Sequence, residues 1–339
     1  MSAFLARRVL LAVGVLAAVS FGTFALMATK FSSTCVSAYT PSGVFAPPLA
    51  SNVGQATNLY WGWVKGIPSG RSLGGLCGGQ SVQEQVWPAF VHTGLLLAGT
   101  AVLVVCFSLL LGTLAATRAG SVVDGVLRGF SYAAWAVPSF VLALMLQSAF
   151  NWAGSRFGFR WFELSGWPGS CIGQGGYSYV CEQTSGSLHH AVEVVRHLVV
   201  PVVALSVAFI GLHSRYLRSS LLVALNAPFT TTARAKGLPE RRVVLRHALR
   251  NSLATFASAL LLDFGAIFGA AMAVDWVFRL NGLGTLFIAE VAGIGSGDSP
   301  RYLNPYAIES LLTGAAALVV CSSVLAEVVV LRLDPRTRP

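Results

Sequence analysis

Charged side chains are scarce in this chain of 339 residues. Asp, Glu, Lys and Arg together make up 11% of it, against about a quarter of a typical soluble domain. So few charges cannot cover a water-exposed surface, which excludes a water-soluble globular protein. Disorder is also excluded, because disordered chains are poor in apolar residues, whereas 55% of this chain is hydrophobic and its mean hydropathy is +0.68. The composition therefore indicates a polytopic membrane protein.

Lysine is especially rare. The chain has only Lys30, Lys65 and Lys236, and none of them follows a glycine. A Walker A motif needs a Gly-Lys pair, so the glycine-rich stretch 66–79 is not a phosphate-binding loop, and the chain cannot bind ATP by that motif. The net charge of +10 would suit nucleic acid, but the positions of the basic residues decide what it means.

Long apolar runs occupy most of the chain. A helix needs ~20 apolar residues to cross a bilayer, and six runs reach that length: 9–29, 88–117, 129–155, 197–222, 251–278 and 302–331. We therefore expect an all-α polytopic membrane protein with six transmembrane helices. Pro138 removes a backbone donor inside the third run and should kink that helix.

The first run follows Arg7 and Arg8, a pattern that secretory signal peptides share. The apolar core of a signal peptide has about 7–15 residues. The run 9–29 is longer, so we expect an uncleaved membrane anchor.

Basic residues gather in the shorter connections. With a cytoplasmic N-terminus, 15 of the 23 Lys and Arg residues fall in cytoplasmic segments and eight fall outside. Because cytoplasmic loops carry the excess of Lys and Arg, we expect both termini in the cytoplasm. Orientation and membrane lipid then account for the basic charge, with no nucleic-acid partner.

This topology divides the chain into three parts. Residues 1–29 form the N-terminus and first span, 30–87 an extracytoplasmic segment, and 88–339 a five-span core. The core includes a cytoplasmic loop, 223–250, and an extracytoplasmic loop, 156–196. The aromatic residues of the 30–87 segment suit either a membrane interface or contact with an extracytoplasmic partner or ligand.

Four cysteines fall in the extracytoplasmic segments: Cys35, Cys77, Cys171 and Cys181. Four cysteines in an oxidising compartment allow three pairings. Cys171 with Cys181 would close a short glycine-rich loop, and Cys35 with Cys77 would tie the ends of the first outer segment. Free thiols are the alternative, because spacing does not reveal the distances between Cα atoms.

A histidine-rich stretch precedes the fourth span. His190, Glu193 and His197 share a helical face by their spacing. They lie on an outer loop with no second ligand cluster nearby, so we expect no metal site.

The loop between spans four and five begins LNAPFTTTARAKGL. Asn226 can cap a helix with Pro228 in its first turn, and Gly237 suits the left-handed residue that ends one. A helix of about ten residues is ~15 Å long, too short to cross a bilayer. We expect it to lie along the membrane surface.

Phe229, Thr232, Ala233 and Lys236 share one face of this short helix by their spacing. Pro239 then starts a second, basic helix with the sequence ERRVVLRHALR. Its arginines could simply attract anionic lipid headgroups. That reading does not explain the ordered series of cap, helix, glycine, proline and helix, which is typical of a compact rigid element.

The segment TTARAKGLPERRVVLRHALRNSL resembles the EAA loop of ABC importer permeases, most closely that of the B-type dipeptide and oligopeptide permease subunits. Residues 232–238 and 247–251 match that family's TARAKGL and HALRN patterns. Further similarities are Arg7–Arg8, Tyr60–Trp61–Gly62–Trp63, Asp275 with Phe278, Gly282–Leu283–Gly284 and Asp334–Pro335–Arg336. The departures are Thr231 at the acidic position of the motif, the absence of proline from Arg250 to Phe256, and Asn281 before Gly282.

The resemblance implies a non-catalytic permease subunit of the bacterial cell membrane. With a second permease it would form the pathway for di- or oligopeptides, delivered by an extracytoplasmic binding protein. Two partner ATPases would hold ATP and Mg²⁺, while this chain would hold no cofactor. ATPase coupling would fall on Phe229, Thr232, Ala233, Arg234, Ala235, Lys236, Gly237 and Leu238.

Two aspartates lie in or near the fifth span. A carboxylate at membrane depth usually faces a bundle interior or a water-filled cavity, so Asp263 could line the pathway and attract a peptide's amino terminus, or it could contact a neighbouring span or subunit. Asp275, nearer the outer interface, could line the pathway, be solvated or form a loop salt bridge.

A membrane enzyme or a channel that uses both aspartates is the alternative function. The two residues lie ~18 Å apart along a helix, too far for a shared reaction. A channel would not need the two-helix loop.

Overall fold

The computed structural model describes residues 2–30, 50–66, 82–158, 162, 164–168, 170–172, 178–180, 187–292 and 305–333. Its elements are α1 (Ser2–Lys30), α2 (Val53–Gly66), α3 (Val82–Thr117), α4 (Val122–Ala136), α5 (Ser139–Phe157), β1 (Ser170–Ile172), β2 (Ser178–Val180), α6 (Ser187–Leu225), α7 (Pro228–Ala235), α8 (Glu240–Arg242), the π-helical segment η2 (Val243–Ala248), α9 (Leu249–Leu262), α10 (Phe264–Phe278), α11 (Leu283–Ala292) and α12 (Pro305–Leu333).

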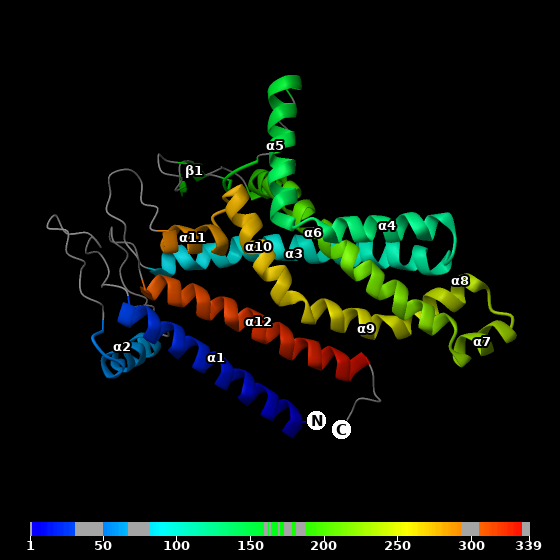
Figure 1. Cartoon of the computed structure of the whole chain (residues 1–339), viewed down its shortest axis with the longest axis horizontal. Coiled ribbons are helices and arrows are strands. Elements are labelled where there is room, and N and C mark those ends of the chain that lie inside the picture. Colours follow the sequence, from blue (N-terminus) through cyan, green and yellow to red (C-terminus); the bar gives the residue numbers. More distant parts are fainter. Residues whose placement is uncertain are drawn as a thin grey trace.

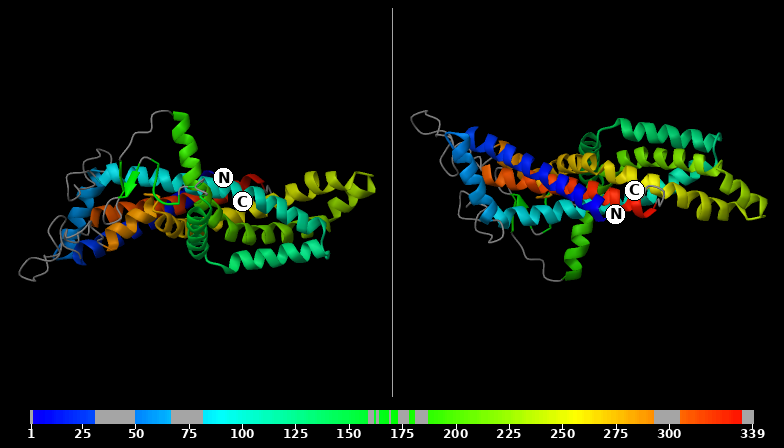
Figure 2. Two further views of the ribbon diagram at one scale, coloured as in Figure 1. Left: turned by 90° about the horizontal axis from the view of Figure 1, so that it is seen from above. Right: turned by 90° about the horizontal axis from the view of Figure 1, so that it is seen from below.

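Most of the long helices run roughly along the long axis of the molecule (Figures 1 and 2). α3 and α6 pack together at the centre, α4, α5, α9 and α10 pack on α6, and α1 packs on α12 and α2. α7 and α8 lie at one end with the α3–α4 turn, whereas α2 and α11 lie toward the other (Figure 1). The start of α1 and the end of α12 both point toward the α7 end, as an even number of membrane crossings requires.

The expected all-α membrane architecture is confirmed. Within the described residues, α1, α3, α6 and α12 are each long and apolar enough to cross a membrane, and the pairs α4–α5 and α9–α10 raise the number of spans to six if each bent pair is one span. The described residues also include one antiparallel hairpin, of β1 and β2, in which Cys171 lies opposite Tyr179. It falls in the predicted outer loop 156–196.

The third predicted span is not one rod. α4 and α5 meet at an angle of 93°, and α5 projects almost perpendicular to the long helices (Figure 1). Pro138 is the N-cap residue of α5, and Val137 before it is extended, as expected for the residue that precedes a proline. The predicted kink at Pro138 is confirmed, and it is a right-angled turn.

The fifth predicted span is also bent. α8, η2 and α9 follow one another without a break to Leu262, and α10 continues at an angle of 48°. Asp263 is the residue at the bend, where its N–H donates to the carbonyl of Ala259 and its own carbonyl accepts from Ile267. Pattern analysis of residues 251–278 did not predict this bend, because no proline marks it.

The main core lies where α3, α6 and α10 meet, around buried residues such as Leu96, Leu205 and Phe278. Glycine allows close helix crossings. A Cβ at Gly211 of α6 would lie 2.6 Å from the carbonyl oxygen of Ser131 on α4. Small residues of this kind let membrane helices approach closely.

α1 is attached to α12 by a buried polar cluster. The carboxylate of Glu309 accepts hydrogen bonds from Ser20 at 3.0 Å, Thr23 at 2.7 Å and Thr313 at 2.6 Å. Tyr60 of α2 donates to Ser20 at 3.3 Å. The aromatic cluster noted in the first outer segment therefore packs, at least through Tyr60, against α1.

The disulfide predictions remain predictions. The backbone of Cys171 lies in β1, and Cys35, Cys77 and Cys181 lie outside the described residues. Two other cysteines, Cys106 and Cys321, are free and exposed.

Candidate coupling loop and membrane carboxylates

The short helix of the predicted loop is α7. Its N-cap residue is Ala227, without a side-chain cap, and Pro228 is its first residue. The prediction that Asn226 caps this helix was wrong, because its amide donates instead to the carbonyl of Leu222, at 3.0 Å, in the last turn of α6. The predicted stop is confirmed: Gly237 has a φ of +75°, the left-handed conformation that glycine adopts readily.

One side of α7 packs on the protein and the other is exposed. Thr230 is fully buried, and its hydroxyl lies within hydrogen-bond distance of the carbonyls of Ala224, Leu225 and Ala227. Ala233, one turn further on, is also buried.

Spacing had placed Ala233 on a shared face with Phe229, Thr232 and Lys236. The structure corrects that face, because Ala233 packs inward with Thr230. The exposed residues of α7 and the turn after it are Pro228, Phe229, Thr231, Thr232, Arg234, Ala235, Lys236 and Gly237, while Leu238 is half-buried.

Arg234 connects the two helices of the loop. Its Nε and Nη2 donate to the carboxylate of Glu240 at 3.0 and 2.7 Å, and its Nη1 donates to the carbonyl of Leu225 at 3.1 Å. The hydrogen bonds to Glu240 raise the pKa of the Arg234 guanidinium. One side chain therefore joins the end of α6, α7 and the start of α8 across Gly237.

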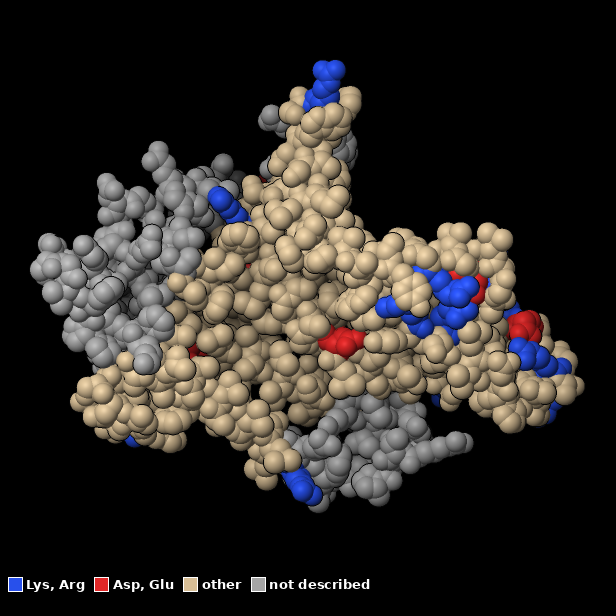
Figure 3. Space-filling view, viewed as in Figure 1, with Lys and Arg blue, Asp and Glu red and all other residues tan. Residues whose placement is uncertain are grey.

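The second helix of the loop is irregular. α8 passes into η2, where the N–H of Leu249 donates to the carbonyl of Val244 five residues earlier. Val243, Val244 and Ala248 are buried, while Arg241, Arg242 and Arg250 are exposed. On the face shown in Figure 3, Lys and Arg gather over α4, α6 and α7 at this end of the molecule, and the middle is mostly uncharged.

A clamp between α4 and α6 lies beside this basic region. The Asp124 carboxylate is 1% exposed and accepts from Nε and Nη2 of Arg218, both at 2.7 Å. Ser121 caps α4 by accepting from the N–H of Asp124. The clamp fixes the start of α4 against α6 by a bidentate pair, the strongest form of this contact.

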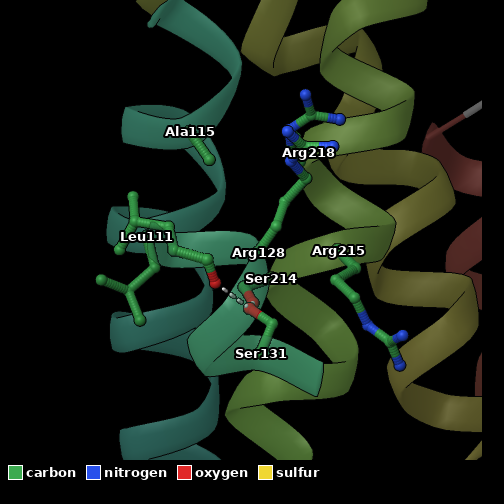
Figure 4. Close-up of a pocket in the computed structure, with 8 residues that line it drawn as sticks. Leu111, Ala115, Arg128, Ser131, Ser214, Arg215 and Arg218 are labelled. Carbon is green, nitrogen blue, oxygen red and sulfur yellow. Dashed lines mark hydrogen bonds between the residues drawn. The ribbon is translucent and has the colours of Figure 1, made fainter. Parts of the chain in front are cut away.

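Next to the clamp lies a shallow recess between α3, α4 and α6 (Figure 4). The hydroxyls of Ser131 and Ser214 are in contact across it at 3.1 Å, and Leu111 and Ala115 line it from α3 (Figure 4). None of the predicted site residues lies in this recess.

Asp263 lies at the bend between α9 and α10, with 31% of its side chain exposed. One of its oxygens, Oδ2, is 3.4 Å from Nε2 of His213, which is fully buried in α6. The bend thus brings a half-open carboxylate of the fifth span against a buried histidine of the fourth.

Asp275 has the opposite environment. It is fully buried, and its carboxylate accepts from the N–H groups of Gly282, Gly284 and Thr285 and from the Thr285 hydroxyl, at 2.7–3.1 Å. These amides belong to the first turn of α11 and the turn before it, where unpaired N–H groups favour a negative partner. Neither solvation nor a loop salt bridge describes it, because the carboxylate holds the α10–α11 turn.

Sequence reasoning missed Asp124 with Arg218 and the role of His213. A charged or ionisable residue in an apolar run is a signal in itself, and Arg218 and His213 both lie in the fourth predicted span. Their partners, however, are far away in the sequence, and no local pattern identifies them.

The helical spans and the two-helix loop with its left-handed glycine suit the membrane component of a transporter. The chain belongs to the family of binding-protein-dependent transport system inner membrane components, whose model matches residues 108–339. Members are multi-pass inner-membrane subunits of ABC importers that work with a binding protein and partner ATPases. They are not catalytic themselves and carry no cofactor, since ATP is bound by the ATPases.

Several curated relatives are oligopeptide permeases. The chain is 27% identical over 258 residues to the oligopeptide transport system permease protein AppB of Bacillus subtilis, covering 76% of this chain and 72% of AppB. It is 29% identical over 208 residues to OppB of Salmonella typhimurium, covering 61% of this chain and 59% of OppB. It is 28% identical over 348 residues to OppB of Mycobacterium tuberculosis, covering 100% of this chain and 99% of OppB.

Proposed function

We propose that this chain is the permease subunit of an ATP-driven importer of di- or oligopeptides. With a second permease it forms the translocation pathway, and an extracytoplasmic binding protein delivers the peptide. Two ATPase subunits bind ATP and Mg²⁺ and drive the cycle. The peptide substrate is inferred from the printed names of the relatives, AppB and OppB.

The observation that carries this proposal is the construction of loop 223–250. α7 has an exposed outer side, a buried inner side and a fixed connection to α8 through Arg234 and Glu240. A helix held in this way can transmit a push without bending. We infer that α7 inserts into a groove on one ATPase, and that closure of the ATPase dimer moves the loop as a rigid body and switches the pathway between outward and inward access.

Within α7 and the turn that follows it, the roles divide by exposure. Phe229, Thr232, Ala235 and Lys236 are available to an ATPase. Arg234 and Gly237 fix the shape of the loop. Ala233 and Leu238 support it from the protein side.

The orientation follows from the same proposal. The α7 loop contacts cytoplasmic ATPases, so the start of α1 and the end of α12, which point toward the same end, are cytoplasmic. Residues 30–87 and 156–196 then face the binding protein. The excess of Lys and Arg near α7 agrees with this orientation.

Asp263 is the residue we assign to the pathway. Its open carboxylate at membrane depth needs a polar environment. Asp275 has no open side, so we assign it to the architecture of the outer end. A shared reaction of the two, as an enzyme would need, has no support in these environments.

The test is Gly237→Val in the complete importer, because a β-branched residue strains the left-handed conformation at this position. Gly120→Val is a matched control: Gly120 also has a left-handed φ, +79°, and a Cβ would meet nothing within 4 Å at either glycine. We expect Gly237→Val to lower peptide uptake per ATP hydrolysed about tenfold with the complex assembled, and Gly120→Val to leave that ratio near wild type.

The readout is uptake of a radiolabelled tripeptide and phosphate release from the same reconstituted vesicles. If both variants couple uptake to hydrolysis as the wild type does, the lever assignment is wrong. If both lose coupling equally, the effect is general backbone strain, and the assignment is wrong as well.

A further inference from the structure

The His213–Asp263 contact joins the two helical segments that flank the coupling loop, residues 223–250. α6 leads into α7 from one side, and α8, η2 and α9 leave it on the other. They meet again at membrane depth, where Nε2 of His213 lies 3.4 Å from Oδ2 of Asp263. Both atoms are buried, and neither completes a hydrogen bond of good geometry with any described residue.

The surroundings of His213 indicate where its protons lie. Nδ1 is 2.9 Å from the carbonyl oxygen of Phe209, an acceptor only, so Nδ1 carries a hydrogen. In a neutral imidazole Nε2 would then have a lone pair, which would face the Asp263 carboxylate. The contact is attractive when a proton lies between the two groups, so the charge of His213 decides whether it attracts the carboxylate.

The other groups against the pair are mostly aromatic. The rings of Phe209, Tyr216 and Phe256 surround the imidazole at centroid distances of 6.4, 5.9 and 6.2 Å, and the carbonyl of Ala259 faces it from α9. Tyr216 is the titratable member of this group. Histidine is the side chain that titrates between about pH 5 and about pH 8.

The open side of Asp263 continues into a face of small residues. On α10 the exposed positions after the bend include Ala266 and Gly269, with Ala270 and Ala273 half-buried. This face has no charged side chain between Asp263 and the half-exposed Trp276 at its far end. The carboxylate beside it is therefore the group to which a polar ligand moving along that face could bind.

We propose that Asp263 is a binding site for a cationic group, the terminal ammonium of a transported peptide, and that His213 is the positioning residue that regulates its charge. Protonated His213 neutralises the carboxylate. When His213 gives its proton to water, Asp263 is free to pair with the ammonium. The identity of the cation rests on the proposed function, whereas the site itself does not.

The test measures the local charge directly in the assembled importer in lipid nanodiscs. Ala266→Cys places a thiol one turn from Asp263 on the exposed face. It reacts with a cationic and an anionic methanethiosulfonate of matched size, and mass spectrometry reads the labelling. The ratio of the two rates cancels the thiolate fraction, and Val122→Cys, at an exposed position just after the α3–α4 turn, is the matched control.

We expect the cationic-to-anionic ratio at residue 266 to fall about tenfold when Asp263→Asn is added, because one nearby negative charge is lost. The ratio at the Val122→Cys control should stay constant. Asp263→Glu should restore much of it. Leu262→Asn, at the exposed neighbouring position, should change neither ratio. A thiol at 266 that does not react in the complex, or a ratio that ignores Asp263→Asn, would overturn the proposal.

His213 has its own readout. The ratio should rise with pH between about pH 5 and about pH 8, as histidine loses its proton, and His213→Gln should flatten that rise while keeping the high value. A simple packing role for His213 predicts the same pH profile in both proteins, and that result would remove His213 from the site.

The same vesicles separate the two proposals. If trialanine uptake fails to depend on ATP in the wild-type complex while the charge preference at 266 is present, the peptide function is wrong and the cation site stands. If uptake is ATP-driven but the labelling ratio is unaffected by either variant, the cation site is wrong and the permease function stands.

Discussion

The two ends of α10 carry the same side chain in opposite environments. Asp263 precedes the helix with one open oxygen and a distant histidine contact, and Asp275 in its last turn is sealed among four donors. A satisfied carboxylate stabilises a fold, whereas an incompletely satisfied one remains available to a ligand. The number of donors around each group, rather than its depth in the membrane, therefore separates architecture from function.

The largest expected effect is on the sealed end. Asp275→Ala leaves the amides of Gly282, Gly284 and Thr285 without their acceptor, so we expect a loss of about 3–5 kcal/mol in the free energy of unfolding. Asp263→Ala, the same change at the other end of α10, should lower the free energy of unfolding by no more than about 1 kcal/mol. Tryptophan fluorescence during thermal unfolding of the purified protein measures both. Equal losses in the two variants would remove the distinction drawn above.

The Asp124 clamp extends the comparison to the opposite end of the bundle. Its carboxylate is as buried as that of Asp275 but accepts mainly from a side chain, Arg218, with one further bond from the N–H of Gly120. We expect Asp124→Ala to cost about 2–3 kcal/mol, because Arg218 is left partly buried without its partner. Arg128→Ala is the control: this arginine is half-exposed and 3.6 Å from Asp124, so it should change stability by no more than about 0.5 kcal/mol. A comparable loss of unfolding free energy in Arg128→Ala would show that the net charge of the region, and not the Asp124–Arg218 pair, determines the stability.

The smallest effect on stability is expected at the exposed ion pair of the coupling loop. The Arg234–Glu240 pair lies at the surface, with its side chains 41% and 60% exposed, so Glu240→Gln should change unfolding by less than about 1 kcal/mol. Coupling should change more, because the pair fixes α7 to α8, and uptake per ATP should fall by a smaller factor than in Gly237→Val. Arg242→Gln, at a nearby exposed arginine, should alter neither. A coupling ratio unchanged in Glu240→Gln would show that the pair is dispensable to the lever.

Local rules predicted the parts of this protein that local chemistry determines. Hydrophobic length identified the six span regions, proline identified the turn at residue 138, and glycine identified the end of α7. These features depend on residues within a few positions of each other. Family resemblance over the loop then pointed to the same class of protein as the family match to residues 108–339.

The parts that were missed depend on contacts between distant segments. The bend at Asp263 has no proline at it, and its partner His213 lies 50 residues earlier. Ala233 fitted a face by spacing, but packing on η2 and α6 turned it inward. Spacing along a helix gives the relative directions of its side chains, and only tertiary contacts decide which direction is outward.

The π-helical segment η2 has a consequence for the phase of the coupling loop. A π turn contains one residue more than an α turn, and each residue of an α-helix rotates the chain by about 100°. η2 therefore offsets α8 and α7 by roughly that angle from the direction that a continuous α9 would give them. A deletion or insertion of one residue within 243–248 would rotate α8 and α7 by about 100° relative to α9. The spans beyond it would keep their sequence and their lipid contacts, while the exposed side of α7 would turn away from its docking direction.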